Sequence, residues 1–225
     1  MFAIVGLGNP GARYAKNRHN AGFRVIERLV ARAAVSTPGQ SFNWEKKFGC
    51  CFVQAKLANT ASLLVMPQTY MNRSGEACVP LLHYFRVEKD QLIVVHDDLD
   101  LEPGVLRIRR GGSAGGHRGL ENMMLHWNRD DFIRVRIGIG HPCRKAHSEL
   151  SPEVDAEREA LSFLSHEEAV TRWVLGNAVG IQQEEIEKTL NDAAEAICEL
   201  ISGGLESAQR RFNRVNKRLP EKGPV

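Results

Sequence analysis

The chain has 225 residues, of which 43% are hydrophobic, and its formal net charge at pH 7 is +3. We expect one folded domain, and the small net charge does not by itself indicate nucleic-acid binding. The sequence lacks a secretory signal pattern and any window close to the roughly 20 apolar residues of a membrane helix, so we expect a cytoplasmic protein without a membrane anchor. The five cysteines form an odd set without C-x-x-C spacing, which argues against a disulfide framework and against a cysteine zinc site.

The N-terminal half predicts three strands and two helices. Residues 2–6 form a short apolar run that ends in glycine, and residues 23–34 repeat apolar side chains at helical spacing. Two apolar runs, 50–57 and 62–66, are separated by a turn-like segment and predict an antiparallel pair of strands. A further helix is predicted over residues 74–85.

The middle of the chain predicts a central strand and two further strands. Residues 92–95 form a β-branched run typical of a strand buried on both faces, and Asp97 follows directly. Strands are also predicted over 105–109 and 132–139, with a helix over 120–127 between them. Strands interleaved with helices indicate an α/β fold, in which a central mixed, mostly parallel sheet is flanked by helices.

The C-terminal third is predicted to be mainly helical. Residues 148–160 are polar and acidic, and we interpret them as an exposed, expendable excursion from the domain. Helices are predicted over 167–175, 183–202 and 205–217, with the break between the last two at Gly203-Gly204.

The whole chain is interpreted as one unit. The domain is predicted to span residues 1–219, and residues 220–225 are predicted to be a disordered tail.

One motif points to a different function. The segment 6–11 satisfies G-x-G-x-x-G after a predicted strand, which is the dinucleotide-binding pattern. That pattern requires the glycine loop to open directly into a helix, whereas Pro10 and the polar segment 13–18 separate the two here. The expected acidic partner would be Glu27, which lies inside a predicted helix. A nucleotide-dependent oxidoreductase is therefore a disfavoured alternative, which saturable NAD binding would revive.

Polar side chains at the ends of apolar elements form a candidate hydrolytic site. His19 with a carboxylate such as Asp97 can take a proton from water near neutral pH. The carboxamides of Asn9 and Asn72 are neutral donors that suit a peptide backbone or a developing oxyanion. The sequence has neither a G-x-S-x-G elbow nor an HExxH pair, so we expect activated water without a metal or another cofactor.

A set of motifs in fixed order extends over nearly the whole chain. They are Val5-Gly6-Leu7-Gly8-Asn9-Pro10-Gly11, Arg18-His19-Asn20-Ala21-Gly22, Tyr70-Met71-Asn72-Arg73-Ser74-Gly75, His96-Asp97-Asp98-Leu99-Asp100, Gly115-Gly116-His117-Arg118-Gly119, Arg134-Val135-Arg136-Ile137-Gly138-Ile139-Gly140-His141-Pro142 and Val174-Leu175-Gly176. In these motifs the sequence resembles the bacterial peptidyl-tRNA hydrolase family. The resemblance implies a monomeric esterase that cleaves the ester bond between peptide and tRNA and returns tRNA to translation.

The resemblance also assigns roles to residues. It implies that His19 is the catalytic base and Asp97 its partner, with the peptidyl end of the substrate positioned by Asn9, Asn72 and His117. It implies that the pocket is shaped by Tyr14 and Met71, and that tRNA phosphates are held by Arg109, Arg136 and Lys145.

The chain departs from the family at two places. Arg118 stands where the family commonly has asparagine, at a position that contacts the substrate near the tRNA end. The segment 148–160 is an insertion. The alternative function is a non-catalytic RNA-binding paralogue that serves as an RNA-processing accessory, and the presence of the four candidate catalytic residues argues against it.

Overall fold

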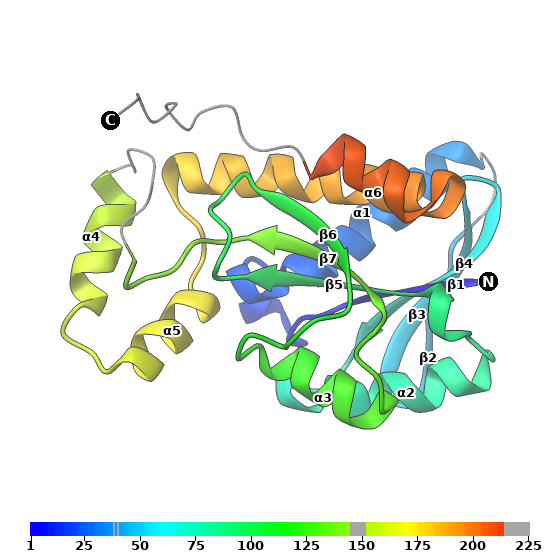
Figure 1. Cartoon of the computed structure of the whole chain (residues 1–225), viewed down its shortest axis with the longest axis horizontal. Coiled ribbons are helices and arrows are strands. Elements are labelled where there is room, and N and C mark those ends of the chain that lie inside the picture. The colour runs from blue at the N-terminus through cyan, green and yellow to red at the C-terminus, as the bar shows by residue number, and fades with distance from the viewer. Residues whose placement is uncertain (38, 40, 145–151, 214–225) are drawn as a thin grey trace.

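The computed structural model describes residues 1–37, 39, 41–144 and 152–213. Within this part of the chain one seven-stranded sheet has the order β2-β3-β4-β1-β5-β7-β6 (Figure 1). The strands are β1 (Phe2–Gly6), β2 (Glu45–Lys47), β3 (Cys50–Leu57), β4 (Thr60–Pro67), β5 (Leu92–Asp98), β6 (Leu106–Arg110) and β7 (Ile133–Gly138).

The centre of the sheet is parallel. β1 pairs in parallel with β4 and β5, and β5 pairs in parallel with β7. β3 and β2 extend one side in antiparallel order, and β6 closes the other edge antiparallel to β7. The predicted single-domain α/β fold with a mixed, mostly parallel sheet is confirmed.

Helices cover both faces of the sheet. The helices are α1 (Ala21–Ser36), α2 (Ser74–Tyr84), α3 (Arg118–Trp127), α4 (Pro152–Leu161), α5 (His166–Leu175) and α6 (Gly180–Phe212), and the short 3-10 helices are η1 (Ala12–Tyr14), η2 (Arg18–Asn20), η3 (Met71–Arg73) and η4 (Lys89–Gln91). The α1–α6 layer packs on one face and the α2–α3 layer on the other, each over its own hydrophobic cluster. α4 and α5 lie beyond the end of the sheet toward which β5 and β7 point (Figure 1). None of the helices in the described part combines the length and apolar composition that a bilayer crossing requires.

Most predicted elements are present, and their ends differ by a few residues. β5 extends to Asp98, so Asp97 lies within the strand and pairs with Ile137 of β7. The predicted helix break is present, because Gly204 has φ of 80° and interrupts α6. The short edge strand β2 was not predicted. Residues 214–225, which include the predicted tail, lie outside the described residues.

The interpretation of residues 148–160 as an exposed excursion is correct for most of the described side chains but misses that this part is a helix docked on the domain. Residues from Pro152 onward form α4, in which Val154 is fully buried. Glu157 on the same helix forms an ion pair with the buried Arg18. The acidic, polar sequence concealed this because the helix buries only Val154 and Leu161 and makes its ion pair through one carboxylate.

The glycine motif has a steric explanation. A Cβ atom at Gly6 would lie 2.3 Å from the carbonyl oxygen of Gly22, and a Cβ atom at Gly22 would lie 2.3 Å from the backbone nitrogen of Leu7. A Cβ atom at Gly8 would meet the ring of Phe23 at 2.6 Å. The glycines therefore let the first turn of α1 lie directly against the end of β1, which is a packing role and requires no nucleotide.

Because α1 and β1 lie so close together, one added methyl group between them should lower the stability of the fold substantially. Gly22→Ala should lower the free energy of unfolding by at least about 2 kcal/mol, because the new Cβ meets backbone atoms that cannot move independently. Chemical denaturation measures this. Gly203→Ala is the control, since the atoms nearest to its Cβ belong to the side chains of Glu199 and Ser207 and not to the backbone. Equal stability of the two variants would contradict the packing role.

His96 in the central strand predicts how stability depends on pH. Burial, reinforced by the neighbouring His117, lowers the pKa of His96 to about 3. Between that value and about 6.5 the unfolded chain binds a proton that the folded protein does not, so stability decreases as the pH falls through this window. From pH 7 to pH 5, His96 should account for a loss of about 2 kcal/mol.

Denaturation curves of the wild type and His96→Gln at both pH values provide the measurement. The variant should lose about 2 kcal/mol less than the wild type over this interval. Parallel pH dependences of the two proteins would show that His96 is not held neutral by the fold.

Candidate active site

A cavity of about 750 Å³ opens at the carboxyl ends of the parallel strands. Its wall contains residues from the end of β1, η3, the end of β5, the N-terminal turn of α3 and one face of α5. In open α/β sheets this edge is where sites form, because loops from neighbouring strands meet there. The candidate residues Asn9, His19, Asn72, Asp97 and His117 all line this cavity.

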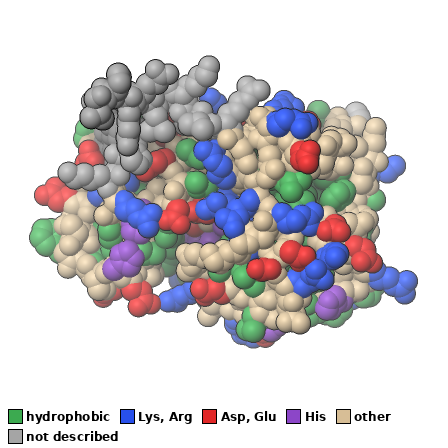
Figure 2. Space-filling view, in the orientation of Figure 1, with side chains coloured by type: hydrophobic (Ala, Val, Ile, Leu, Met, Phe, Trp, Pro, Cys, Tyr) green, Lys and Arg blue, Asp and Glu red, His purple; other side chains and the backbone are tan. Residues whose placement is uncertain are grey.

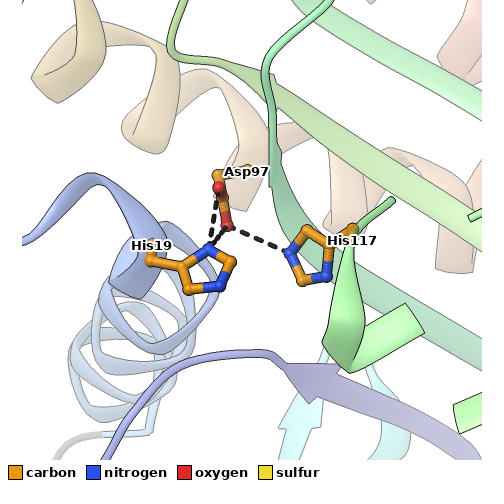
Figure 3. Close-up of side chains that lie close together, drawn as sticks. All are labelled: His19, Asp97 and His117. Atoms are coloured by element: carbon orange, nitrogen blue, oxygen red, sulfur yellow. Dashed lines mark hydrogen bonds and ion pairs between the residues drawn. The ribbon is translucent and has the colours of Figure 1, made fainter. Parts of the chain in front are cut away.

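Two histidines converge on one buried carboxylate (Figure 3). His19 Nδ1 lies 2.9 Å from Oδ1 and 3.0 Å from Oδ2 of Asp97, and His117 Nε2 lies 3.2 Å from the same Oδ1. The Asp97 side chain is 2% exposed, whereas that of His19 is 13% exposed. The carboxylate is thus sealed in the protein, and its histidine partner faces the cavity.

The hydrogen bonds determine which ring nitrogens carry protons. The Leu120 backbone N–H donates to His117 Nδ1 at 3.3 Å, so the His117 proton is on Nε2 and donates to Asp97. An ionised Asp97 is an acceptor only, so His19 must donate to it through Nδ1–H. His19 Nε2 is then the acceptor nitrogen that remains for a water molecule.

Asp97 is ionised despite its burial. Burial alone raises the pKa of Asp97, but the His19 and His117 rings act in the opposite direction through charge and hydrogen bonds. The net result is a pKa well below its ordinary value. The carboxylate is therefore available at neutral pH to stabilise an imidazolium on His19.

A pair of asparagines joins the end of β1 to the segment that carries His19. The backbone N–H of Asn9 donates to Asn20 Oδ1 at 3.0 Å, and Asn20 Nδ2 donates to the Asn9 carbonyl at 2.9 Å. The Asn9 side chain in turn accepts a hydrogen bond from the Met71 backbone N–H at 2.9 Å. The side-chain NH₂ of Asn9 is the group left to donate to a substrate, and the exposed Asn72 follows Met71 in the cavity wall.

Arg18, directly before His19, is fully buried. Its guanidinium donates to Glu157 of α4 at 2.6 and 2.9 Å, to Gln182 of α6 at 2.7 and 2.9 Å, and to the Trp173 carbonyl of α5 at 3.0 Å. It also lies 3.8 Å from the centre of the Trp173 ring. Arg18 therefore connects three helices to the backbone of the catalytic segment.

Arginines from β6 and β7 form the cationic part of the cavity wall. Arg109 and Arg134 are register partners in the two strands, and Arg136 follows on the same face as Arg134. Arg136 Nε donates to Asp98 at 2.6 Å, and Arg109 Nε donates to the Gly111 carbonyl at 2.8 Å. All three arginines line the cavity.

Three further predicted site residues are Tyr14, Lys145 and Arg118. Tyr14 is not among the residues that line the cavity. The Arg13 guanidinium lies over its ring, with 4.5 Å between Cζ and the ring centre. Lys145 lies outside the described residues. Arg118 lines the cavity, and its side chain pairs with Glu167 of α5.

Several residues of this region were not predicted from the sequence. Arg134 could have been found, because it alternates with apolar residues in a strand and so shares the face of Arg136. The stacked pair of His141 and His166, with ring centres 5.4 Å apart, also lines the cavity. Arg18 belongs to a motif quoted above, but its burial had no sequence signal, because arginine is rarely buried and its partners are 139 or more residues away.

One group of ionisable side chains in the described part of the chain has spacing compatible with a metal ion. The ligand atoms of His19, Asp97 and His117 lie within 4.8 Å of one another. In the present arrangement the two ring nitrogens that face the carboxylate carry its hydrogen-bonding protons, so the same nitrogens are not free to bind a cation. The arrangement matches a hydrogen-bonded acid–base group better than a ligand set.

The sequence and the fold have close counterparts. The sequence profile of the peptidyl-tRNA hydrolase family matches residues 3–221. The peptidyl-tRNA hydrolase of Dehalococcoides mccartyi strain CBDB1 is 39% identical over 216 residues, which cover 95% of this chain and 100% of the relative. That of Desulforamulus reducens is 38% identical over 216 residues, which cover 96% of this chain and 90% of the relative.

A solved structure agrees with the same assignment. The crystal structure of peptidyl-tRNA hydrolase from Acinetobacter baumannii superposes with a TM-score of 0.78 at 32% sequence identity, over 95% of this chain and 94% of that one. Agreement of sequence and fold over nearly the full length, together with the site geometry, shows that the chain belongs to the peptidyl-tRNA hydrolase family.

Proposed function

We propose that the protein hydrolyses the ester bond between a peptide, or an N-blocked amino acid, and the 3′ end of tRNA. The observation that carries the proposal is the His19–Asp97 pair, in which a buried carboxylate orients the ring and leaves Nε2 facing a cavity. This reaction releases free tRNA for reuse in translation. We also propose that the protein acts as a cytoplasmic monomer.

The geometry supports a general-base mechanism. His19 Nε2 accepts a proton from a water molecule as the water oxygen attacks the ester carbonyl carbon, and Asp97 stabilises the imidazolium that forms. Collapse of the tetrahedral intermediate breaks the bond to the ribose oxygen, which takes the proton back from His19. The products are a free peptide carboxyl group and a tRNA hydroxyl group.

Neutral amides stabilise the developing charge in this proposal. The Asn9 side chain is held through its oxygen by Met71, which leaves its NH₂ group as the donor, and Asn72 provides a second amide in the same wall. Amides suit this role because they stabilise an oxyanion without taking the proton that His19 must carry. His117 supports the reaction by holding Asp97 from the other side.

Cationic side chains provide the contact to tRNA. Figure 2 shows Lys and Arg side chains in a row across the middle of one face, with Asp and Glu side chains between them. Arg109 and Arg136 in the cavity wall, together with Lys145, are proposed to hold phosphates, since a guanidinium can bind a phosphate through two parallel hydrogen bonds.

Replacement of the base should separate catalysis from binding. His19→Ala should reduce cleavage of an N-blocked aminoacyl-tRNA by at least about a hundredfold, because removal of a general base removes a contribution of 10²–10⁴. The affinity for tRNA should change little, since the ring is not a phosphate ligand. Release of free tRNA in the presence of a chelator measures the activity, and a binding assay with deacylated tRNA measures the affinity.

The wild type in the same chelator is the control. Chelator-resistant cleavage that is lost in His19→Ala supports a water activated without a metal. Near-normal turnover of the variant refutes the base assignment, and tRNA binding by a wild type that cleaves nothing indicates the accessory RNA-binding function instead.

Loss of one phosphate contact should be visible in the salt dependence. Arg109→Ala and Arg136→Ala should each weaken tRNA binding and reduce the slope of log K against log salt by about one, because one fewer counterion is released. Arg129→Ala is the control, as its ion pair with Asp131 lies outside the cavity wall. An unchanged slope in the two cavity variants would remove these arginines from the binding surface.

A further inference from the structure

An exposed ion pair joins two walls of the cavity. Arg118, the first residue of α3, donates from Nη2 to Glu167 of α5 at 2.9 Å. Both residues line the cavity, and their side chains are 64% and 80% exposed. The two residues are 49 positions apart in the sequence, so the pair is a product of the fold and not of one helix.

The position of Arg118 is not explained by the stability of α3. A positive charge in the first turn of a helix opposes the helix dipole, which favours anions there. Glu167, in contrast, is in the first turn of α5, where a carboxylate is favourable. The charge of Arg118 therefore does not favour the start of α3, and in the structure its carboxylate partner, Glu167, comes from α5.

The same arrangement recurs around the cavity. Arg136 is paired with Asp98 at 2.6 Å, and Arg144 is paired with Asp100 at 2.6 Å. All four of these residues line the cavity as well. Figure 2 shows positive and negative side chains interspersed across one face of the molecule. Three arginines of the cavity wall, Arg118, Arg136 and Arg144, are thus paired in advance with carboxylates of the protein. Arg109 and Arg134, in contrast, donate to backbone carbonyls.

The pairs differ in how easily they can be separated. The Arg136–Asp98 side chains are 20% and 12% exposed, and this pair is shielded from solvent. The Arg118–Glu167 pair is much more exposed, and exposed pairs of this kind contribute little to stability, because water screens them. Glu167 accepts a single hydrogen bond from Arg118, whereas a phosphate can accept two from one guanidinium, so a phosphate can replace Glu167 as the partner.

We propose that Glu167 is a built-in competitor for an RNA phosphate at Arg118. In the free protein it holds the guanidinium at the cavity mouth, and a phosphate near the acceptor end of the tRNA displaces it on binding. The inference rests on the proposed function for the identity of the RNA. Its consequence is weaker binding of deacylated tRNA, which favours release of the product and disfavours RNA that offers no further contacts.

The proposal predicts a gain of affinity on removal of a carboxylate. Glu167→Gln should bind deacylated tRNA up to about fivefold more tightly than the wild type, the equivalent of about 1 kcal/mol. Inhibition of ester cleavage by deacylated tRNA should set in at correspondingly lower concentrations. A merely structural role for Glu167 would give weaker binding or none of these changes.

A charge-matched variant controls for net charge. Glu187→Gln also removes one carboxylate from arginines, Arg24 and Arg28, but none of these three residues lines the cavity. It should leave tRNA affinity unchanged. Thermal unfolding of each variant checks that the fold is intact.

The double variant identifies the partner. In an Arg118→Ala background, Glu167→Gln should no longer raise the affinity, because the guanidinium that Glu167 neutralises is gone. A gain that persists there, or an equal gain in Glu187→Gln, overturns the proposal. Binding and cleavage are measured separately: a wild type that binds tRNA but cleaves no ester refutes the proposed function, whereas normal cleavage with unchanged binding of Glu167→Gln refutes only this inference.

Discussion

The arrangement of the site depends on a negative charge buried at the end of the central strand. Asp97 is 2% exposed, and a carboxylate so deeply buried must be paired or it becomes protonated. Two imidazole rings from distant segments provide the pairing, one before α1 and one at the N-cap of α3. The same hydrogen bonds that keep the charge stable assign the tautomers of both rings. The hydrogen bonds that stabilise the charge of Asp97 are therefore the same ones that leave His19 Nε2 free to accept a proton.

A second buried charge, the guanidinium of Arg18, helps to fix the position of His19. Arg18 precedes His19 and is held by α4, α5 and α6, so the position of the base depends on helices that contribute no catalytic group. The helix α4, which lies in the segment 148–160, belongs to this support, since its Glu157 is one of the partners. A segment of polar, acidic composition thus contacts Arg18, next to the catalytic base, through a single carboxylate. The sequence does not indicate this contact, because the two residues are neighbours only in the folded structure.

Much of the fold was predictable because it follows from local patterns. β-branched runs, helical spacing and a glycine break correctly predicted the parallel centre, the α2 and α3 helices and the interruption of α6 at Gly204. The errors fell where a few long-range contacts decide the structure. The edge strand β2 has no buried side chain, and α4 has two, so neither shows a periodicity that a sequence pattern can detect.

The sequence by itself determined the order of the elements, the family to which the chain belongs and the residues at the ends of β1 and β5, because motif spacing and apolar periodicity are local properties. Only the tertiary structure decided which of those residues meet. It brought His117 to Asp97, left Tyr14 outside the cavity wall, and placed Glu167 opposite Arg118. Ion pairs and buried charges join residues far apart in the chain, and their energies depend on distance and burial, which a linear sequence does not contain.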